Sequence, residues 1–228
     1  MEKIKFQFAM DGAASRSIED ALRMIGDIAD YLDIIETGTS FVLRYGMESV
    51  TRFKAAFPEK KILADMKIMD GGYHHAAMGC RAGGDIITVL GAAAPETIRS
   101  AAQAAHDNGK EIMVDLLCVS HMERAISLCE RIGADYVCVH CGVDMQSTGG
   151  NPYAELLQAV SMTKNCKIAV AGGINEDTIE DICRLGPDVV IVGGAIHKRA
   201  DYISAAGKIH RGIQRVRQEV PSHGASHY

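Results

Sequence analysis

The chain has 228 residues, of which 47% are hydrophobic, a composition that excludes a disordered protein and suits a single α/β barrel. Its net charge is −5 and it contains no stripe of basic residues, so we expect no nucleic-acid partner. Seven irregularly spaced cysteines, and no apolar run near the roughly 18 residues of a membrane span, predict a cytoplasmic protein with reduced thiols and no membrane contact.

Short apolar runs rich in Val and Ile alternate with amphipathic helical patterns along the chain. Such runs are typical of parallel strands that are buried on both faces. The first helix is expected to follow Ser15 or Ser17, since serine is a favoured cap. The predicted strands cover residues 4–10, 31–36, 61–66, 85–90, 111–116, 135–140, 167–171 and 188–192.

The predicted strand ends recur about every 25 to 30 residues. Eight such units favour a closed (β/α)8 TIM barrel over the alternative, an open doubly wound sheet. We therefore predict one catalytic domain over residues 1–217 and a polar C-terminal tail over residues 218–228.

Charged residues gather at the predicted strand ends, where such barrels carry their active sites. Asp65, Lys67 and Asp70 give the strongest local signal, because residues two apart on a strand point to one face. Glu36 ends the second strand, and with Asp65 it offers two carboxylates of the kind that bind Mg²⁺. A structural salt bridge at a strand end is the alternative interpretation.

Three more polar residues end other strands. Asp11 follows the first strand, Asp115 ends the fifth, and His140 ends the sixth. A histidine at this position is suited to moving a proton near neutral pH, whereas a hydrogen-bonded core histidine is the structural alternative.

Two glycine pairs follow the last two strands, Gly172-Gly173 and Gly193-Gly194. Barrels often bind phosphate at this position through loop amides, and glycine allows the backbone to approach an oxyanion closely. The two pairs therefore predict a phosphate-binding site for a small substrate.

The spacing Asp65-x-Lys67-x-x-Asp70 resembles the D-x-K-x-x-D signature of the orotidine-monophosphate-decarboxylase superfamily. Within it the chain is most similar to the 3-hexulose-6-phosphate synthases, with the 3-keto-L-gulonate-6-phosphate decarboxylases as a cousin group. The resemblance extends over residues 4–215 and departs from the synthases at residues 71–75. Three positions are synthase-like: Asp115, Val143 and Ala171.

This resemblance implies a carbon–carbon lyase that joins formaldehyde to D-ribulose 5-phosphate through an enediolate, giving D-arabino-3-hexulose 6-phosphate. It implies Mg²⁺, or Mn²⁺, on Glu36 and Asp65, with His140 moving the proton and Lys67 contacting the reacting oxygens. It also implies a homodimer in which Asp70 reaches the neighbouring subunit's site. Asp11 and Asp115 would orient hydroxyl groups and Lys67.

Two alternatives remain open on the sequence. One is the keto-gulonate-phosphate decarboxylase reaction, or related enediolate chemistry on another sugar phosphate. The other is a barrel that binds a sugar phosphate through its glycine pairs without catalysis.

Overall fold

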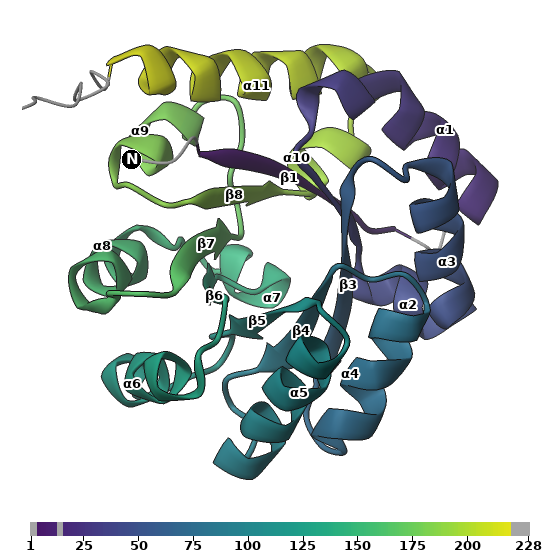
Figure 1. Cartoon of the computed structure of the whole chain (residues 1–228). Coiled ribbons are helices and arrows are strands. Elements are labelled where there is room, and N and C mark those ends of the chain that lie inside the picture. Colours follow the sequence, from purple (N-terminus) through teal and green to yellow (C-terminus); the bar gives the residue numbers. More distant parts are fainter. Residues whose placement is uncertain (1–3, 13–15, 220–228) are drawn as a thin grey trace, which may run out of the picture.

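The structure is a computed structural model that describes residues 4–12 and 16–219. Within these residues the parallel strands pair in chain order and β8 pairs with β1, so the sheet closes into a barrel with helices around it (Figure 1). The predicted (β/α)8 barrel is confirmed. The strands are β1 (Lys5–Met10), β2 (Ile34–Thr37), β3 (Lys61–Ile68), β4 (Ile86–Leu90), β5 (Glu111–Asp115), β6 (Tyr136–His140), β7 (Lys167–Ala171) and β8 (Val189–Val192).

The helices cover the outside of the sheet, and the last long helix lies beside the first (Figure 1). Short α7 and α10 follow β6 and β8 directly, at the carboxyl ends of those strands. The helices are α1 (Ile18–Ile28), η1 (Ala29–Tyr31), α2 (Thr39–Tyr45), α3 (Met47–Ala56), α4 (Gly72–Arg81), α5 (Pro95–Asp107), α6 (Met122–Ile132), α7 (Val143–Gln146), α8 (Tyr153–Met162), α9 (Ile179–Arg184), α10 (Gly194–His197) and α11 (Tyr202–Glu219).

The start of the first helix and the boundary of the C-terminal tail can both be compared with their predictions. Ser17 caps α1 through a capping box with Asp20, whereas the alternative start Ser15 lies outside the described residues. Helix α11 continues to Glu219, two residues into the predicted tail, and the rest of that tail, residues 220–228, lies outside the described residues.

The second strand begins later than the predicted range 31–36. Ala29–Tyr31 form a turn of 3-10 helix, closed by the Leu32 N–H donating to the Ala29 carbonyl oxygen. Leu32 is buried against the core without belonging to a strand. An apolar run indicated burial correctly here, but burial does not determine the backbone conformation.

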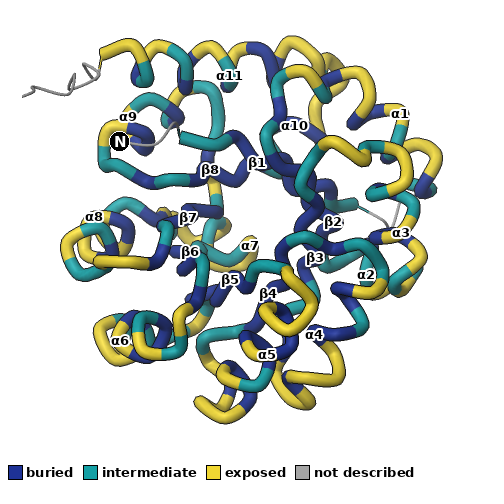
Figure 2. The backbone as a smooth tube through the Cα atoms, in the orientation of Figure 1, coloured by how far each residue is buried: buried dark blue, intermediate teal, exposed yellow. Residues whose placement is uncertain are grey.

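Alternate strand residues point into the barrel, and their neighbours pack against the helices. Figure 2 shows the strands as the most deeply buried part of the backbone. The inward residues form an apolar core that closes the barrel beneath its carboxyl-terminal mouth. Its members are Ala9, Ile34, Leu63, Ile86, Met113, Tyr136, Cys138, Ala169, Ala171, Val189 and Ile191.

The opposite end of the barrel, its floor, repeats one hydrogen bond four times. An aspartate just before each even-numbered strand accepts the backbone N–H of the second residue of the preceding odd-numbered strand. Because these amides lie at the very start of the sheet, the side chain satisfies a donor that would otherwise lack a partner. The four contacts are Asp33 with Phe6 at 2.9 Å, Asp85 with Ile62 at 3.0 Å, Asp135 with Ile112 at 2.9 Å, and Asp188 with Ile168 at 2.7 Å.

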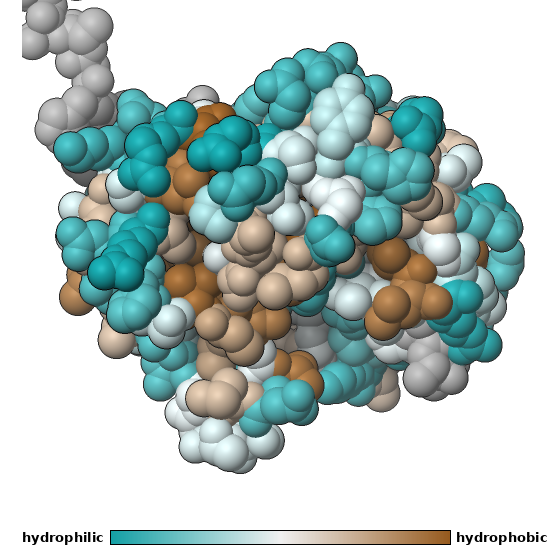
Figure 3. All heavy atoms as spheres, turned by 90° about the horizontal axis from the view of Figure 1, so that it is seen from below, coloured by the Kyte–Doolittle hydropathy of each residue, from teal (hydrophilic) through white to brown (hydrophobic). Residues whose placement is uncertain are grey.

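On the side shown in Figure 3, hydrophilic residues lie mostly towards the edges, and residues of intermediate and hydrophobic character lie across the middle. Among the described residues no helix has both the length and the apolar character needed to span a bilayer.

Candidate active site

A pocket of about 890 Å³ opens at the carboxyl ends of the strands, which we call the mouth. It collects residues from all eight strands or the loops after them, although these residues lie far apart in the sequence. Every site residue predicted from the sequence lines it, with the exception of Asp70. The predicted residues present are Asp11, Glu36, Asp65, Lys67, Asp115, His140, Gly172, Gly173, Gly193 and Gly194.

Lys67 lies between two carboxylates at the centre of the mouth. Its ammonium nitrogen is 2.9 Å from Asp65 Oδ2 and 3.0 Å from Asp115 Oδ2. Burial alone would lower the pKa of Lys67, but the charges of Asp65, Asp115 and Glu36 outweigh it and raise the pKa above its usual value. Lys67 is therefore a permanent cation and hydrogen-bond donor that faces the pocket.

His140 is oriented by Asp115. Its Nδ1 lies 2.9 Å from Asp115 Oδ2, while the Leu117 N–H donates to Asp115 Oδ1 at the same distance. Burial would raise the pKa of Asp115, but the bonds to His140, the Lys67 charge and the Leu117 amide lower it to about 2. A charged Asp115 favours the proton on Nδ1, which leaves Nε2 of His140 to act as a base.

Glu36 carries the least compensated charge of the cluster. Its side chain is 7% exposed, and Gln7 Nε2 donates to its Oε2 at 2.6 Å. Burial raises the pKa of Glu36 well above its usual value, and the charges of Asp65 and Asp11 raise it further despite Lys67. A cation beside Glu36 would stabilise its ionised form.

Glu36 and Asp65 fit a divalent metal ion of the Mg²⁺ type. They point into the mouth from the adjacent strands β2 and β3, and they offer the hard oxygen ligands that Mg²⁺ prefers. Across the described residues, no group of three His, Cys, Asp or Glu side chains is placed to hold a metal. Mg²⁺ usually takes one or two carboxylates from a protein and fills its remaining positions with water and substrate oxygens.

The end of β3 is irregular at Lys67. The pairing of β3 with β4 shifts between Ala64 and Ile68, and Lys67 has a φ of 43°, in the left-handed region. Asp65 and Lys67 both face the pocket, as the spacing of two residues predicted, but the bulge also contributes to the direction of the Lys67 side chain.

The glycine pair after β7 is required by its geometry. Gly172 has a φ of 106°, and a Cβ at this position would lie 2.2 Å from the Cys141 carbonyl oxygen. Gly173 also has a positive φ, of 71°. Any other residue would displace the loop after β6, so the backbone forms this side of the pocket.

Asp70 stands apart from the other predicted site residues. It is exposed, and its carboxylate accepts the Gly71 N–H at 2.8 Å instead of facing the pocket of its own chain. His75 binds the Asp70 carbonyl oxygen at 2.8 Å, and both His74 and His75 are exposed. The role of Asp70 across a dimer interface stays a prediction.

The departure at residues 71–75 has a structural cause. A Cβ on Gly72 would lie 2.2 Å from the Thr97 carbonyl oxygen, because α4 packs closely on α5 there. Gly71, with a φ of 63°, turns the chain into α4. The residues that differ from the synthases at positions 71 and 72 therefore serve the packing of α4 on α5 beside the mouth.

Sequence reasoning missed several polar residues that line the pocket, among them Gln7, Thr39, Thr88 and His197. Gln7 and Thr88 could have been found, because each is a polar residue at an inward position of an otherwise apolar strand. His197 is 5% exposed on α10, and only the return of the chain after β8 brings it to the pocket.

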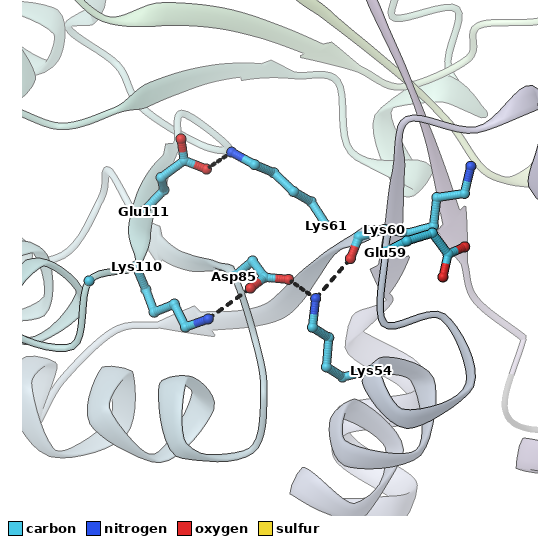
Figure 4. A pocket seen from close by; sticks show the side chains of 8 residues that line it. Lys54, Glu59, Lys60, Lys61, Asp85, Lys110 and Glu111 are labelled. Atoms are coloured by element: carbon cyan, nitrogen blue, oxygen red, sulfur yellow. Dashed lines mark hydrogen bonds and ion pairs between the residues drawn. The ribbon is translucent and has the colours of Figure 1, made fainter.

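A second hollow, on the floor, contains charges of both signs that are paired with one another (Figure 4). Asp85 accepts from Lys54 and Lys110 at 2.8 Å each, and Lys61 binds Glu111. The Lys54 ammonium also donates to the Lys60 carbonyl oxygen at 2.9 Å. These contacts link α3 to the starts of β3, β4 and β5, and they identify the hollow as a structural network.

The fold and the mouth together define a TIM-barrel enzyme, with a histidine on a carboxylate, a lysine between carboxylates and glycine loops around one pocket. Residues 5–209 match the orotidine 5'-phosphate decarboxylase / HUMPS family. The chain belongs to this family, and the predicted resemblance and carbon–carbon lyase class are confirmed.

Similar proteins cover nearly the whole chain. A protein of Bacillus subtilis (strain 168) named 3-hexulose-6-phosphate synthase is 39% identical over 206 residues, 90% of this chain and 97% of that protein. A protein of the same name from Staphylococcus aureus (strain NCTC 8325 / PS 47) is 39% identical over 196 residues, which are 86% of this chain and 93% of that protein. The crystal structure of 3-hexulose-6-phosphate synthase from Salmonella typhimurium is 39% identical with a TM-score of 0.89, and covers 93% of this chain and 100% of that one.

Proposed function

We propose that this enzyme is a 3-hexulose-6-phosphate synthase, which adds formaldehyde to D-ribulose 5-phosphate and gives D-arabino-3-hexulose 6-phosphate. The observation that carries the proposal is the single pocket that joins Glu36 and Asp65 to the glycine loops, with Lys67 and His140 between them. The proteins of that name at 39% identity support it.

The phosphate of the substrate binds at the glycine loops after β7 and β8, which fixes the sugar in one register. The C1 end of the sugar then reaches His140, whose Nε2 removes a proton from C1 and leaves an enediolate. C1 of the enediolate attacks the formaldehyde carbon, and the new alkoxide takes up the proton that His140 removed. Lys67 donates to the oxygens on which negative charge develops.

Mg²⁺ would bind to Glu36 and Asp65, and when bound it would stabilise the negative charge of the enediolate. Asp115 holds His140 in the tautomer that accepts a proton and also positions Lys67. Asp11 accepts from the Ser40 hydroxyl at 2.9 Å and lines the pocket, where it would orient a sugar hydroxyl.

The direct test is to incubate the purified protein with D-ribulose 5-phosphate, formaldehyde and Mg²⁺ and to measure formaldehyde loss. We expect turnover that stops with EDTA and returns with added Mg²⁺. In parallel, 3-keto-L-gulonate 6-phosphate is supplied and carbon dioxide is measured. Carbon dioxide release without formaldehyde consumption would contradict the synthase assignment and support a decarboxylase instead.

The proposed enzyme works as a homodimer in which Asp70 completes the partner's site. Exposed Met69 and Tyr73 flank Asp70 and would be covered in such a dimer. The test uses two inactive variants, Asp70→Asn and His140→Asn. Equal amounts of the two are mixed in the unfolded state and refolded together. Hybrid dimers hold one intact site each, so roughly a quarter of wild-type activity should return. No recovery, or a monomer by light scattering, would contradict the dimer.

A further inference from the structure

Thr88 is a buried residue of β4 that contacts two members of the site at once. Its side chain is 2% exposed and points into the barrel. The Lys67 N–H donates to its hydroxyl oxygen at 2.9 Å, and the hydroxyl donates to Asp65 Oδ1 at 3.0 Å. A hydroxyl has one hydrogen and two lone pairs, so this geometry uses it both as acceptor and as donor.

The contact with Lys67 falls where the sheet is irregular. Ala64 pairs with Ile87 and Ile68 pairs with Val89, so β3 spans more residues than β4 between these two pairs. The backbone amide of a residue in such a bulge leaves the regular ladder and needs another acceptor. The Thr88 hydroxyl is that acceptor, and Lys67 is held there at a φ of 43°.

The contact with Asp65 fixes the other end of the same ion pair. Asp65 accepts from Thr88 at Oδ1, from the Thr39 hydroxyl at Oδ2, and from the Lys67 ammonium at 3.0 and 2.9 Å. One hydroxyl therefore constrains the backbone that carries Lys67 and also the carboxylate that the Lys67 ammonium binds.

We propose that Thr88 is a positioning residue, which holds the bulge of β3 so that the Lys67 ammonium and the Asp65 carboxylate stay in register for the reaction. The inference rests on the proposed function, because it assigns Thr88 to the same site. Thr88 acts through Lys67 and Asp65, so its loss should reduce turnover more than substrate binding.

The experiment compares four proteins: wild type, Thr88→Val, Thr88→Ser and Thr37→Val. Valine keeps the shape of threonine and removes the hydroxyl, whereas serine keeps the hydroxyl. Thr37→Val is the matched control, because Thr37 is a fully buried strand residue whose hydroxyl has no hydrogen-bond partner within the described part of the chain. If Thr88→Val does not fold, Thr88→Cys replaces it, since a thiol is a weak donor and acceptor.

We expect Thr88→Val to lower kcat about 10- to 100-fold, the range for residues that orient site side chains. The KM for D-ribulose 5-phosphate should change less than about threefold, and Thr88→Ser and Thr37→Val should stay near wild type. Wild-type kcat in folded Thr88→Val, or in Thr88→Cys where that variant replaces it, would overturn the proposal. An equal loss of kcat in Thr88→Ser would also overturn it, because the hydroxyl would then not be the cause.

A second measurement separates this proposal from the proposed function. Amide hydrogen exchange across residues 61–70 reports the bond from the Lys67 N–H without any turnover. Faster exchange in Thr88→Val than in Thr88→Ser supports the positioning role even if wild type consumes no formaldehyde, a result that would overturn only the synthase assignment. Equal exchange in both would overturn the positioning role, whatever the activity.

Discussion

The floor and the mouth of the barrel both contain lysines and carboxylates, but neighbouring groups compensate the carboxylates to different extents at the two ends. At the floor, burial would raise the pKa of Asp85, yet Lys110, Lys54 and the Ile62 amide lower it. At the mouth, Asp115 is compensated in the same way, whereas the pKa of Glu36 is raised. The floor carboxylate is compensated by neighbouring lysines, whereas the function proposed above assigns Glu36 a cation from outside the protein.

The largest expected effect concerns the proton-transfer residue of the mouth. His140→Asn should lower kcat by about 10²- to 10⁴-fold, the usual contribution of a general base, because the amide cannot remove a proton. Binding of D-ribulose 5-phosphate, followed by calorimetry, should persist. Glu59→Gln, at an exposed carboxylate of the floor hollow, is the control and should keep wild-type kcat. Full turnover in His140→Asn would remove His140 from its assigned role.

Glu36→Gln should weaken the activation of the enzyme by Mg²⁺ and change the pH dependence of stability. A folded-state pKa raised above 4.5 means that the native state retains its proton longer than the unfolded state. The metal-free wild type should therefore lose stability, relative to the variant, as the pH rises from 4.5 through the raised pKa. Urea unfolding across that range measures the difference. Parallel curves for the two proteins would mean that the Glu36 charge is already compensated.

At the floor, Asp85→Asn should lower the free energy of unfolding by about 2 kcal/mol, because two lysines lose the charge that they share. The kcat per folded molecule should not change, since Asp85 lies at the opposite end of the barrel from the mouth. Urea unfolding and the formaldehyde assay, carried out on the same preparation, test both parts. A loss of kcat without a loss of stability would connect the two ends of the barrel.

Glu130→Gln should give the smallest effect. Glu130 accepts the backbone N–H groups of Lys164, Asn165 and Cys166 ahead of β7, and these bonds lower its pKa from 4.5 to about 2 against the opposing effect of burial. Its contribution is present above pH 4.5 and is lost as the pH falls towards 2. Because the side chain is well solvated, we expect only about 1 kcal/mol at pH 7. Thermal unfolding at pH 7 and pH 3 checks this, and an equal difference at both would contradict it.

The sequence predicted the barrel and the membership of the pocket because both follow from local patterns. Apolar runs at regular spacing determine the strands, and a charged residue at a buried strand end must find a partner. Glu36, Asp65, Lys67, Asp115 and His140 were identified in this way, and the structure brings them together.

The rest depends on contacts between distant segments. The bulge at Lys67 is held by the Thr88 hydroxyl from the next strand, so the sequence of β3 alone does not predict the bulge. The position of Asp70 outside its own pocket, and the close approach of Gly72 to α5, depend on how whole helices pack. Such features need the assembled fold before they can be recognised.

The four floor aspartates divide the closed sheet into four pairs of strands, since each joins an odd strand to the even strand that follows it. Within the described residues the boundaries between pairs lack this contact but carry others, since the Glu111 N–H donates to the Asp85 carbonyl oxygen and Lys110 binds the Asp85 carboxylate beside the β4–β5 boundary. A circular permutant with new ends in a connection from an even strand to the next odd strand would keep all four pairs whole.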